Sequence, residues 1–339
     1  MTTTLPRPRD TDLHDSPILR WGIIAPGRIA TDWADSVLRH TSQRIVAVGS
    51  RSAERAQAFA ARHGIERAYG SYDELVHDAE VDVVYIASPH SEHEAQALLA
   101  IAAGKHVLIE KPIATTAASA QRIVDAARAA GVFAMEAMWT RYRPQSDVVR
   151  QVLERGDLGE VRVVTAAFNG LAEFDASSRL WDPALAGGAL LDLGVYPASY
   201  GSFVLGSPTR VLASGDLAPS GVDRQAAMIL EHAGGAQAVL TTGLNARTPE
   251  AAMIAGSEGR LEIPSPFWFA DDLRLVDSDG QVVDTWHDPF GRTARESLCC
   301  QAVALARYVG EGRTESPLHT LDETVAVMAT LDEARYQLG

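Results

Sequence analysis

Five short apolar runs, each followed by a turn and then by a helical pattern, constrain the fold more than any other feature of the sequence. The run HVLI is typical, since a parallel strand that is buried on both faces is almost continuously apolar. Strands that alternate with helices predict a parallel, doubly wound α/β sheet. The five runs lie at residues 20–25, 44–48, 81–87, 106–109 and 132–137.

The stretch HVLIEKP at residues 106–112 indicates where a ligand would meet this sheet. Lys111 follows a buried strand directly, and Pro112 cannot continue a central strand because it has no N–H to donate. Ligands of open α/β sheets bind beyond the carboxyl ends of the strands, which is where Lys111 falls. A solvated loop lysine is the alternative.

The turn PGRIA after the first strand approximates the dinucleotide-binding pattern G-x-G-x-x-G/A. Gly27 takes the second glycine position and Ala30 the third, whereas Ala25 replaces the first glycine. Such a loop needs N–H groups that face an anion at the N-terminus of the next helix, and Gly27, Arg28 and Ile29 would provide them. An ordinary strand–helix turn is the alternative.

The end of the second strand bears on the choice of cofactor. An NAD enzyme places a carboxylate there to hold the ribose 2′-hydroxyl, but this chain has Gly49, Ser50, Arg51 and Ser52. Arg51 is well placed for a 2′-phosphate, which favours NADP over NAD. The alternative is that Arg51 only begins an exposed helix.

Two histidines follow the strand at residues 81–87, which ends at Ser88-Pro89-His90. His90 and His93 suggest a metal site, but no cysteine or further histidine lies near them in the sequence. We therefore expect no metal there and place His90 in the ligand cleft at the strand end.

Composition excludes several classes of protein. The net charge of −14 over 339 residues argues against binding to nucleic acid or to an anionic membrane surface, and no apolar run approaches the ~18 residues of a membrane span. Residues 1–18 contain no apolar signal region and are expected to be a disordered lead-in. The only cysteines, Cys299 and Cys300, are adjacent and badly placed to bridge each other, which favours a reducing, cytoplasmic setting.

The second part of the chain has a different pattern. Residues 159–168 form a long predicted strand with alternating polar and apolar side chains, and several strands follow up to about residue 283. Short turns such as Gly234-Gly235 separate them, which predicts a largely antiparallel sheet.

The chain is therefore predicted to be α/β, with a dinucleotide-binding domain at residues 19–143 and an α+β domain at residues 144–339. The large open sheet of the second domain can cover one face with helices and leave the other for a partner chain.

The stretch AGGALLDLGVYP at residues 186–197 carries further polar candidates. Asp192 and Tyr196 are four residues apart, so they would share a face of a helix. Pro197 disfavours α geometry at Tyr196 and costs a helix hydrogen bond, so the helix either kinks or begins anew near Tyr196. Both outcomes can leave the tyrosine hydroxyl pointing into a cleft, and a buried tyrosine with a satisfied hydroxyl is the alternative.

Six stretches, in this order, resemble the glucose–fructose oxidoreductase/inositol dehydrogenase (Gfo/Idh/MocA) family: RWGIIAPGRIA, AVGSRSAERA, YGSYDEL, AGKHVLIEKP, FAMEAMWTRY and GGALLDLGVYP. The similarity is greatest to the branch of dimeric dihydrodiol dehydrogenases and NADP-dependent D-xylose dehydrogenases. The resemblance implies a Rossmann domain followed by a mostly antiparallel domain, through whose open sheet face members often dimerise. It also implies a cis bond before Pro112.

The resemblance assigns roles to individual residues. Lys111 matches the lysine of the EKP motif, Asp192 the aspartate of GGALLDLGVY, and Tyr196 the tyrosine of this branch; these three are the expected catalytic residues. His90 and Trp139 match positions that line the substrate pocket, together with Asp192 and Tyr196. The residues expected to bind the cofactor, NADP with NAD as the alternative, are Gly27, Arg28, Ile29, Ser50, Arg51, Ser88, His90, Glu110 and Lys111.

The implied reaction moves a hydride between nicotinamide and a sugar C1, as in D-xylose, or a trans-dihydrodiol. Tyr196 would be the general acid and base, and Lys111 would lower its pKa from the ordinary ~10. Asp192 would hold substrate hydroxyls, and Trp139 would offer an apolar face to the sugar ring. A keto- or anhydro-sugar reductase and a non-catalytic dinucleotide-binding regulator are the alternatives. The expected partners are a sugar or diol and further copies of the chain in a homodimer or higher homo-oligomer, with neither nucleic acid nor membrane.

Overall fold

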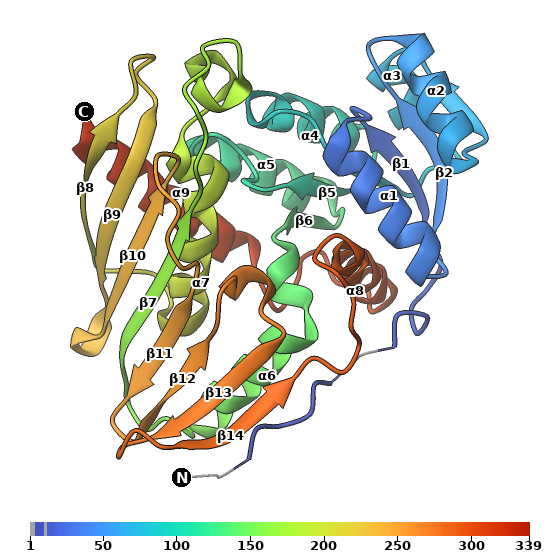
Figure 1. Cartoon of the computed structure of the whole chain (residues 1–339). Helices are drawn as coiled ribbons and strands as arrows, with labels where there is room; N and C mark the ends of the chain where they lie inside the picture. Colours follow the sequence, from blue (N-terminus) through green and yellow to red (C-terminus); the bar gives the residue numbers. More distant parts are fainter. Residues whose placement is uncertain (1–3, 10–11) are drawn as a thin grey trace. The chain divides into compact units, whose positions relative to one another are not determined.

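The computed structural model describes residues 4–9 and 12–339, which form two compact units (Figure 1). The parallel-sheet unit comprises Asp12–Arg143 and Arg292–Thr324. The open-sheet unit comprises Pro144–Gly291 and Val325–Gly339, together with the described residues up to 9.

The parallel-sheet unit has six strands in the spatial order β3-β2-β1-β4-β5-β6, all parallel. Five of them confirm the predicted apolar runs, whereas the short, half-buried β3 was not predicted. Every residue of β4 is buried, which explains why its sequence shows no polar alternation. The strands are β1 (Arg20–Ile24), β2 (Arg44–Gly49), β3 (Arg67–Tyr69), β4 (Val83–Ile86), β5 (His106–Glu110) and β6 (Ala134–Ala137).

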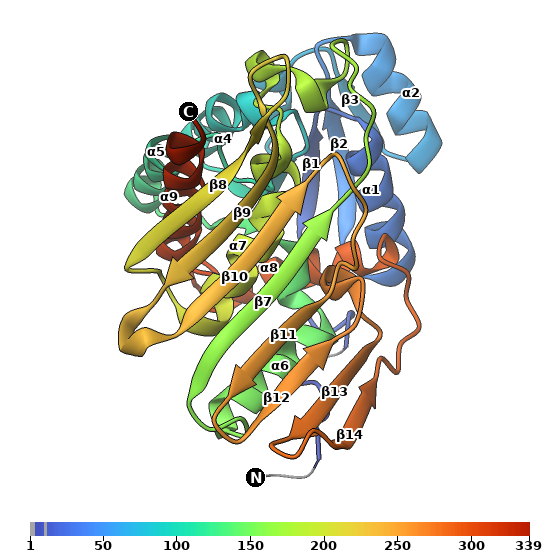
Figure 2. The same ribbon diagram turned by 60° about the vertical axis from the view of Figure 1, so that its left-hand side comes forward.

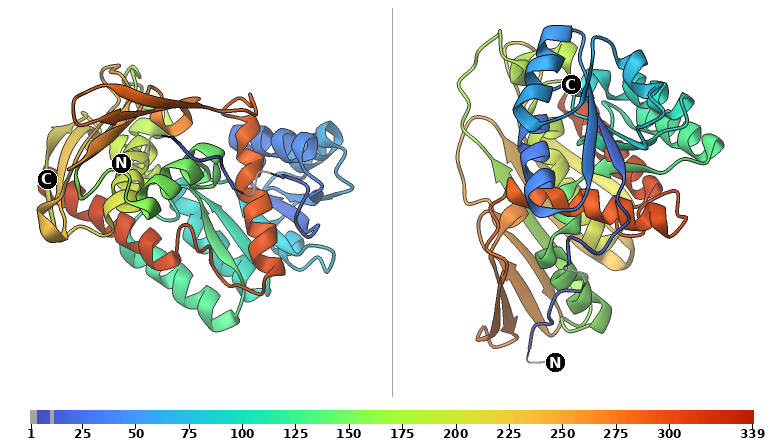
Figure 3. Two further views of the ribbon diagram at one scale, coloured as in Figure 1. Left: turned by 90° about the horizontal axis from the view of Figure 1, so that it is seen from below. Right: turned by 90° about the vertical axis from the view of Figure 1, so that its right-hand side faces the viewer.

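Helices cover both faces of this sheet, with α1 against α2 and α8 on one face and α4 against α5 on the other (Figure 3). Ser52 and Thr116 cap α2 and α5 at their N-termini, and Gly64 and Gly131 end them in the left-handed conformation. The helices are α1 (Arg28–His40), α2 (Ala53–His63), α3 (Tyr72–Val76), α4 (His93–Ala102), α5 (Ala117–Ala130) and α8 (Cys299–Gly310).

The segment Arg292–Thr324, which we expected in the second domain, packs within the parallel-sheet unit instead. The Ser36 hydroxyl of α1 donates to the carbonyl of Glu296 at 2.7 Å and accepts the N–H of Cys299 at 2.9 Å, so α1 holds the start of α8. Cys299 and Cys300 are buried there, and neither forms a disulfide within the described chain.

The lead-in expected to be disordered has defined contacts in its described residues. The Arg9 guanidinium pairs with Asp147 at 2.8 Å, and the Gln43 side chain donates to the carbonyl of Pro17 at 2.8 Å. Residues 1–3 and 10–11, which belong to the same expectation, lie outside the described residues. In the part of the chain that the structure describes, no helix is long and apolar enough to span a membrane.

The open-sheet unit has eight strands in the order β14-β13-β12-β11-β7-β10-β9-β8, seen side by side in Figure 2. All neighbours are antiparallel except β7 and β10, which confirms the largely antiparallel prediction. The strands are β7 (Val161–Asn169), β8 (Arg210–Leu217), β9 (Asp223–Glu231), β10 (Gln237–Gly243), β11 (Ala252–Gly256), β12 (Gly259–Ile263), β13 (Asp272–Asp277) and β14 (Val282–His287).

Helices α6 (Pro144–Arg155) and α7 (Val195–Leu205) lie behind this sheet in Figure 2, and α7 packs on β7 and β10. Helix α9 (Leu321–Leu338) contributes its residues from Val325 onward to this unit. Among the residues of this unit that the structure describes, no helix or strand covers the opposite face of the sheet, as Figure 2 shows.

Strand β8 forms one edge of the sheet, and a side chain of α9 occupies part of that edge. The Gln337 amide donates to the carbonyl of Val211 at 2.8 Å, and its oxygen accepts the N–H of Ala213 at 2.7 Å. Two backbone groups of an edge strand are therefore paired by one side chain.

Candidate functional site

The carboxyl ends of β1, β2, β4 and β5 lie along one edge of the parallel sheet. The chain leaves β1 for β2 on one side and returns to β4 on the other, so the strand order reverses between β1 and β4. Doubly wound sheets bind ligands at such a switch point. The structure brings four of the predicted residues to this edge, namely Gly27, Arg51, Ser88 and Lys111.

The turn after β1 has the backbone of a dinucleotide loop despite its alanine. Ala25 adopts a φ of 64°, the left-handed conformation that a first glycine would adopt at lower cost. The Gly27 N–H donates to the carbonyl of Ala25 at 2.8 Å, so this predicted anion donor is already used within the turn. The N–H groups of Arg28 and Ile29 have no acceptor among the described residues and begin a helix of 13 residues. They remain available for an anion.

Gly27 also leaves room beside these N–H groups. A Cβ on this residue would come no closer than 3.9 Å to another protein atom, so packing within the chain does not require a glycine there. Close approach of a ligand to the backbone would explain it.

Arg51 is exposed at the end of β2, and no carboxylate lies in the turn between β2 and α2. The Ser50 hydroxyl, which we expected near the cofactor, accepts the N–H of Ser52 at 3.2 Å and braces this turn. Burial raises the pKa of Tyr72, and the nearby charge of Arg51 opposes this rise.

Ser88, His90 and His93 follow β4. The Ser88 hydroxyl oxygen is buried and has no hydrogen-bond partner among the described residues. His90 is nearly buried, and its ring lies 5.8 Å from the fully buried ring of His93. His93 contacts two backbone carbonyls, those of Ser88 and Pro112, so its nitrogens serve the structure of the turns.

Glu110 ends β5 as a buried carboxyl. Its Oε1 accepts the Tyr85 hydroxyl at 2.6 Å, and its Oε2 accepts the N–H of Lys111 at 3.3 Å. Burial raises the pKa of Glu110, against the opposing effects of Tyr85 and Lys111. Lys111 is partly buried, the Lys111–Pro112 bond is cis as implied, and Trp139 is 7% exposed after β6.

The open-sheet unit carries Asp192 and Tyr196. A π-helical segment, Leu190–Gly194, runs directly into α7, and Pro197 falls in the first α turn. The helix thus continues through the proline by changing its hydrogen-bond spacing, a feature that is frequent at functional sites. The wider π turn also means that the four-residue spacing in an α-helix does not transfer directly to Asp192 and Tyr196.

Asp223 of β9 holds the start of the π-helical segment. Its Oδ2 accepts the N–H of Leu190 at 2.5 Å, and a Cβ on Gly188 would lie 2.2 Å from its Oδ1. Gly188 has a φ of 111°, so both space and conformation require glycine there. Burial raises the pKa of Asp223 to about 6, although backbone N–H groups of Leu190 and Ala189 oppose the rise.

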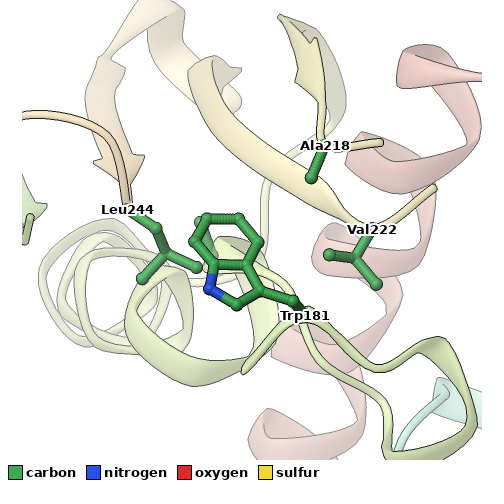
Figure 4. Packing of buried hydrophobic residues seen from close by; sticks show 5 residues of the cluster. Trp181, Ala218, Val222 and Leu244 are labelled. Atoms are coloured by element: carbon green, nitrogen blue, oxygen red, sulfur yellow. The ribbon is translucent and has the colours of Figure 1, made fainter. Parts of the chain in front are cut away.

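A small apolar cluster supports the same segment (Figure 4). Trp181 lies in contact with Ala189, Val222 and Leu244 in this cluster, and its indole N–H donates to the carbonyl of Glu173 at 2.9 Å. The segment that bears Asp192 is therefore fixed by packing as well as by Asp223.

Asp192 and Tyr196 have different surroundings. Arg179 donates to Asp192 at 3.1 Å from a half-exposed position. The Tyr196 ring lies 5.3 Å from the Phe168 ring of β7, which stacks on Trp268 at 5.2 Å. Aromatic rings thus flank the tyrosine on the sheet side.

Sequence reasoning missed Asp223 and Glu136, which are both buried carboxylates that contact backbone next to predicted site residues. Glu136 interrupts the apolar run VFAMEA, and a charge in a fully buried strand requires a partner. That interruption was an available signal for Glu136, whereas nothing in the sequence around Asp223 distinguished it.

The residues at the edge of the parallel sheet fit a dinucleotide. The free N–H groups at the start of α1 suit a pyrophosphate, and the unpartnered Ser88 hydroxyl suits a polar ligand atom. Across the described ranges 4–9 and 12–339, no group of three or more His, Cys, Asp or Glu side chains could hold a metal ion.

Comparison with known proteins gives two family matches that together cover most of the chain. Residues 19–138 match the Gfo/Idh/MocA model described as an oxidoreductase family with an NAD-binding Rossmann fold. Residues 146–262 match the Gfo/Idh/MocA C-terminal domain.

Individual proteins are similar over nearly the whole chain. The trans-1,2-dihydrobenzene-1,2-diol dehydrogenase of Sus scrofa is 36% identical over 95% of this chain and 97% of its own. A 3-ketoreductase from Actinomadura kijaniata, solved with NADP and TDP-benzene, is 27% identical with a TM-score of 0.80 over 95% of this chain and 98% of its own. A levoglucosan dehydrogenase solved with NADH and levoglucosan shares the fold, at 20% identity and a TM-score of 0.85 over 95% of this chain and 98% of its own.

Proposed function

The chain belongs to the Gfo/Idh/MocA family of NAD-binding oxidoreductases, and on this premise we propose that it transfers a hydride between NADP and a hydroxyl-bearing carbon of a sugar or cyclic diol. The observation that carries the proposal is the edge of the parallel sheet. There, Lys111 and the free N–H groups of Arg28 and Ile29 lie at the carboxyl ends of β5 and β1, which flank β4 beside the switch point.

NADP is proposed as the preferred cofactor on the strength of Arg51. A guanidinium suits the 2′-phosphate of NADP, and the turn after β2 offers no carboxylate for the 2′-hydroxyl of NAD. The Arg28 and Ile29 N–H groups would hold the pyrophosphate, and the Ser88 hydroxyl and His90 would lie beside the cofactor. Glu110 would act there through the Lys111 N–H, since both of its oxygens are bonded within the chain.

Tyr196 is proposed as the general base for oxidation and the general acid for reduction. Its Oη would take the proton of the substrate hydroxyl as the carbon becomes a carbonyl, and Lys111 would stabilise the phenolate. When bound, the nicotinamide accepts the hydride from that carbon. Asp192 would accept hydrogen bonds from further substrate hydroxyls, and His90 and Trp139 would line the pocket.

The proposed substrate classes are trans-dihydrodiols and sugars oxidised at C1, with D-xylose as one example. The Sus scrofa relative is named for a dihydrodiol, which supports the first class. Reduction of a keto sugar is the second candidate, because a relative at 27% identity is a 3-ketoreductase. The same acid–base residue would serve both directions.

A homodimer through the open sheet is also proposed, with a higher homo-oligomer as the alternative. The exposed face of the sheet carries Val239 and Ile229, which pair across β10 and β9 and are each 40% exposed. Apolar side chains that neighbour each other on an uncovered sheet suit a second sheet of the same kind.

The proposal is tested with a panel of D-xylose, D-glucose and a trans-dihydrodiol, following the absorbance of reduced nicotinamide. Tyr196→Phe should keep NADP affinity and lose turnover by about 100-fold or more, because loss of a general acid–base costs ~10²–10⁴. Phe168→Leu, which changes a ring beside Tyr196 but no acid or base, is the matched control. Turnover of the phenylalanine variant near that of the wild type would exclude Tyr196 from proton transfer.

A further inference from the structure

The Pro112–Ile113 peptide unit, one residue beyond Lys111, is contacted at both of its polar ends by buried side chains. Its carbonyl, that of Pro112, lies 2.8 Å from Nδ1 of His93. Its N–H, that of Ile113, donates to Oε1 of Glu136 at 2.9 Å. His93 is fully buried and Glu136 is 1% exposed, so water does not compete for either contact.

His93 ties this peptide to the turn after the neighbouring strand. Its other ring nitrogen, Nε2, lies 2.9 Å from the carbonyl of Ser88 at the end of β4. Burial lowers the pKa of His93, so the neutral ring donates to one of these carbonyls and only contacts the other. The ring therefore packs between the turn after β4 and the turn after β5. Both turns carry residues of the candidate site, Ser88 and Lys111.

Glu136 is held in turn by a second buried histidine. Its Oε2 lies 2.8 Å from Nε2 of His319, and Nδ1 of His319 lies 3.3 Å from Glu323. Burial and the nearby Arg141 lower the pKa of His319, but the hydrogen bond to Glu136 and the close carboxylate of Glu323 outweigh them and raise it. The carboxylate thus faces a proton donor on one oxygen and the Ile113 N–H on the other.

These contacts leave the Glu136 side chain little freedom to move. A buried carboxylate costs several kcal/mol unless its oxygens are bonded, so loss of either contact is unfavourable. The backbone on the other side of Lys111 is held as well, since its own N–H donates to Glu110. The N–H groups of Lys111 and Ile113, on either side of Pro112, therefore each donate to a buried acid.

We propose that His93 and Glu136 are positioning residues that fix the direction of the Lys111 side chain by holding the Pro112–Ile113 peptide. The proposal rests on the proposed function, because it assumes that Lys111 acts in catalysis. Misplacing a catalytic group by ~1 Å can cost ~100-fold in rate. Loss of the contacts that His93 and Glu136 make with the Pro112–Ile113 peptide, here called the clamp, should therefore lower kcat.

The first experiment compares Glu136→Gln with Glu136→Leu. Glutamine keeps an oxygen for the Ile113 N–H and an amide that can donate to His319, so its kcat should stay near that of the wild type. Leucine removes both contacts, and its kcat should fall by about 10- to 100-fold. Glu136→Asp, which keeps the charge but cannot reach both Ile113 and His319, replaces the leucine variant if that variant does not fold.

The second measurement reports on the clamp without catalysis. Protein labelled with ¹⁵N-isoleucine gives the Ile113 amide signal, which is assigned by its loss in Ile113→Val. Its hydrogen exchange should be about tenfold faster or more in Glu136→Leu, as expected for loss of a hydrogen bond to a charged group. Gln96→Leu is the matched control, because Gln96 is buried on the same helix as His93 and its Oε1 has no partner among the described residues.

Three results would overturn the proposal: an Ile113 amide unaffected by Glu136→Leu, a glutamine variant as impaired as the leucine variant, or faster exchange with unchanged kcat. The same kinetics are applied to His93→Phe, which keeps a ring but donates no hydrogen bond and should also lose kcat. Full turnover in Lys111→Met would instead refute the proposed function, and the amide exchange would still decide whether the clamp exists.

Discussion

Replacing Asp223 with asparagine should change how the stability of the protein depends on pH. Burial raises the pKa of Asp223 to about 6 from the ordinary 3.8. A group whose folded pKa is raised stabilises the fold fully below its unfolded pKa, and this contribution is lost as the pH rises through the folded pKa. At ~1.36 kcal/mol per pKa unit, a rise of about two units corresponds to about 3 kcal/mol. Wild-type protein should therefore lose about 3 kcal/mol relative to D223N between about pH 4 and about pH 7.

The assay is urea unfolding of both proteins at successive pH values, because the difference between them removes groups that titrate equally in each. Tryptophan fluorescence is a suitable probe, since Trp181 packs with Val222 beside Asp223 (Figure 4). Asp175→Asn is the control: bonds from the Ser177 hydroxyl and N–H lower the pKa of this exposed residue, so its difference should have the opposite sign.

A difference that does not vary with pH would show that Asp223 is as easily ionised in the folded protein as in the unfolded chain. A wild-type protein that gains stability over the same range would mean that the Leu190 and Ala189 N–H groups outweigh burial. Either result would refute the conclusion that burial disfavours the ionised form of Asp223 in the folded protein.

Three further changes have expected outcomes. Arg51→Ala should weaken NADP binding by about 10- to 100-fold and NAD binding little, because a hydrogen bond to a charged group contributes ~1.5–3 kcal/mol; equal losses in titrations of both cofactors would contradict the 2′-phosphate assignment. Ala25→Gly should raise the free energy of unfolding by up to about 1 kcal/mol, because relief of ~1–2 kcal/mol of left-handed strain exceeds the ~0.4–1 kcal/mol of added chain entropy; urea unfolding against Ala25→Val, which should be destabilised, tests this. Val239→Lys should convert a dimer to monomer in light scattering, whereas Val282→Lys, on the edge strand β14, should not; a dimer that persists in Val239→Lys would move the interface away from β10.

The parallel sheet was predictable because its signal is local. Every strand of this sheet except β3 has four or five consecutive buried residues, and the position of Lys111 after β5 follows from that strand alone. Strand β3, with three half-buried residues, gives no such signal. The loop after β1 was predictable only in outline. Its pattern lacks the first glycine, and the structure supplies the same backbone by placing Ala25 at a φ of 64°.

Contacts between distant residues could not be predicted in the same way. Glu136 and His319 are 183 residues apart, and the Ser36 contact that brings α8 to the parallel-sheet unit spans 263 residues. No periodic pattern in the sequence marks either contact, because each depends on residues that come together only in the folded chain. The sequence therefore indicated a boundary near residue 143, but it did not indicate that residues 292–324 belong to the parallel-sheet unit.

The amide of Gln337 has a consequence for the behaviour of the chain in concentrated solution. It pairs two backbone groups of β8, the carbonyl of Val211 and the N–H of Ala213, that a strand from another molecule would otherwise bond. The side chain of Gln337 therefore blocks this part of the edge strand. A protein without the last turn of α9 would keep its folded units but would leave the N–H of Ala213 and the carbonyl of Val211 unpaired on the edge strand β8. Such chains would associate by pairing β8 of one molecule with an edge strand of the next, as in fibril elongation. The proposed site would not change.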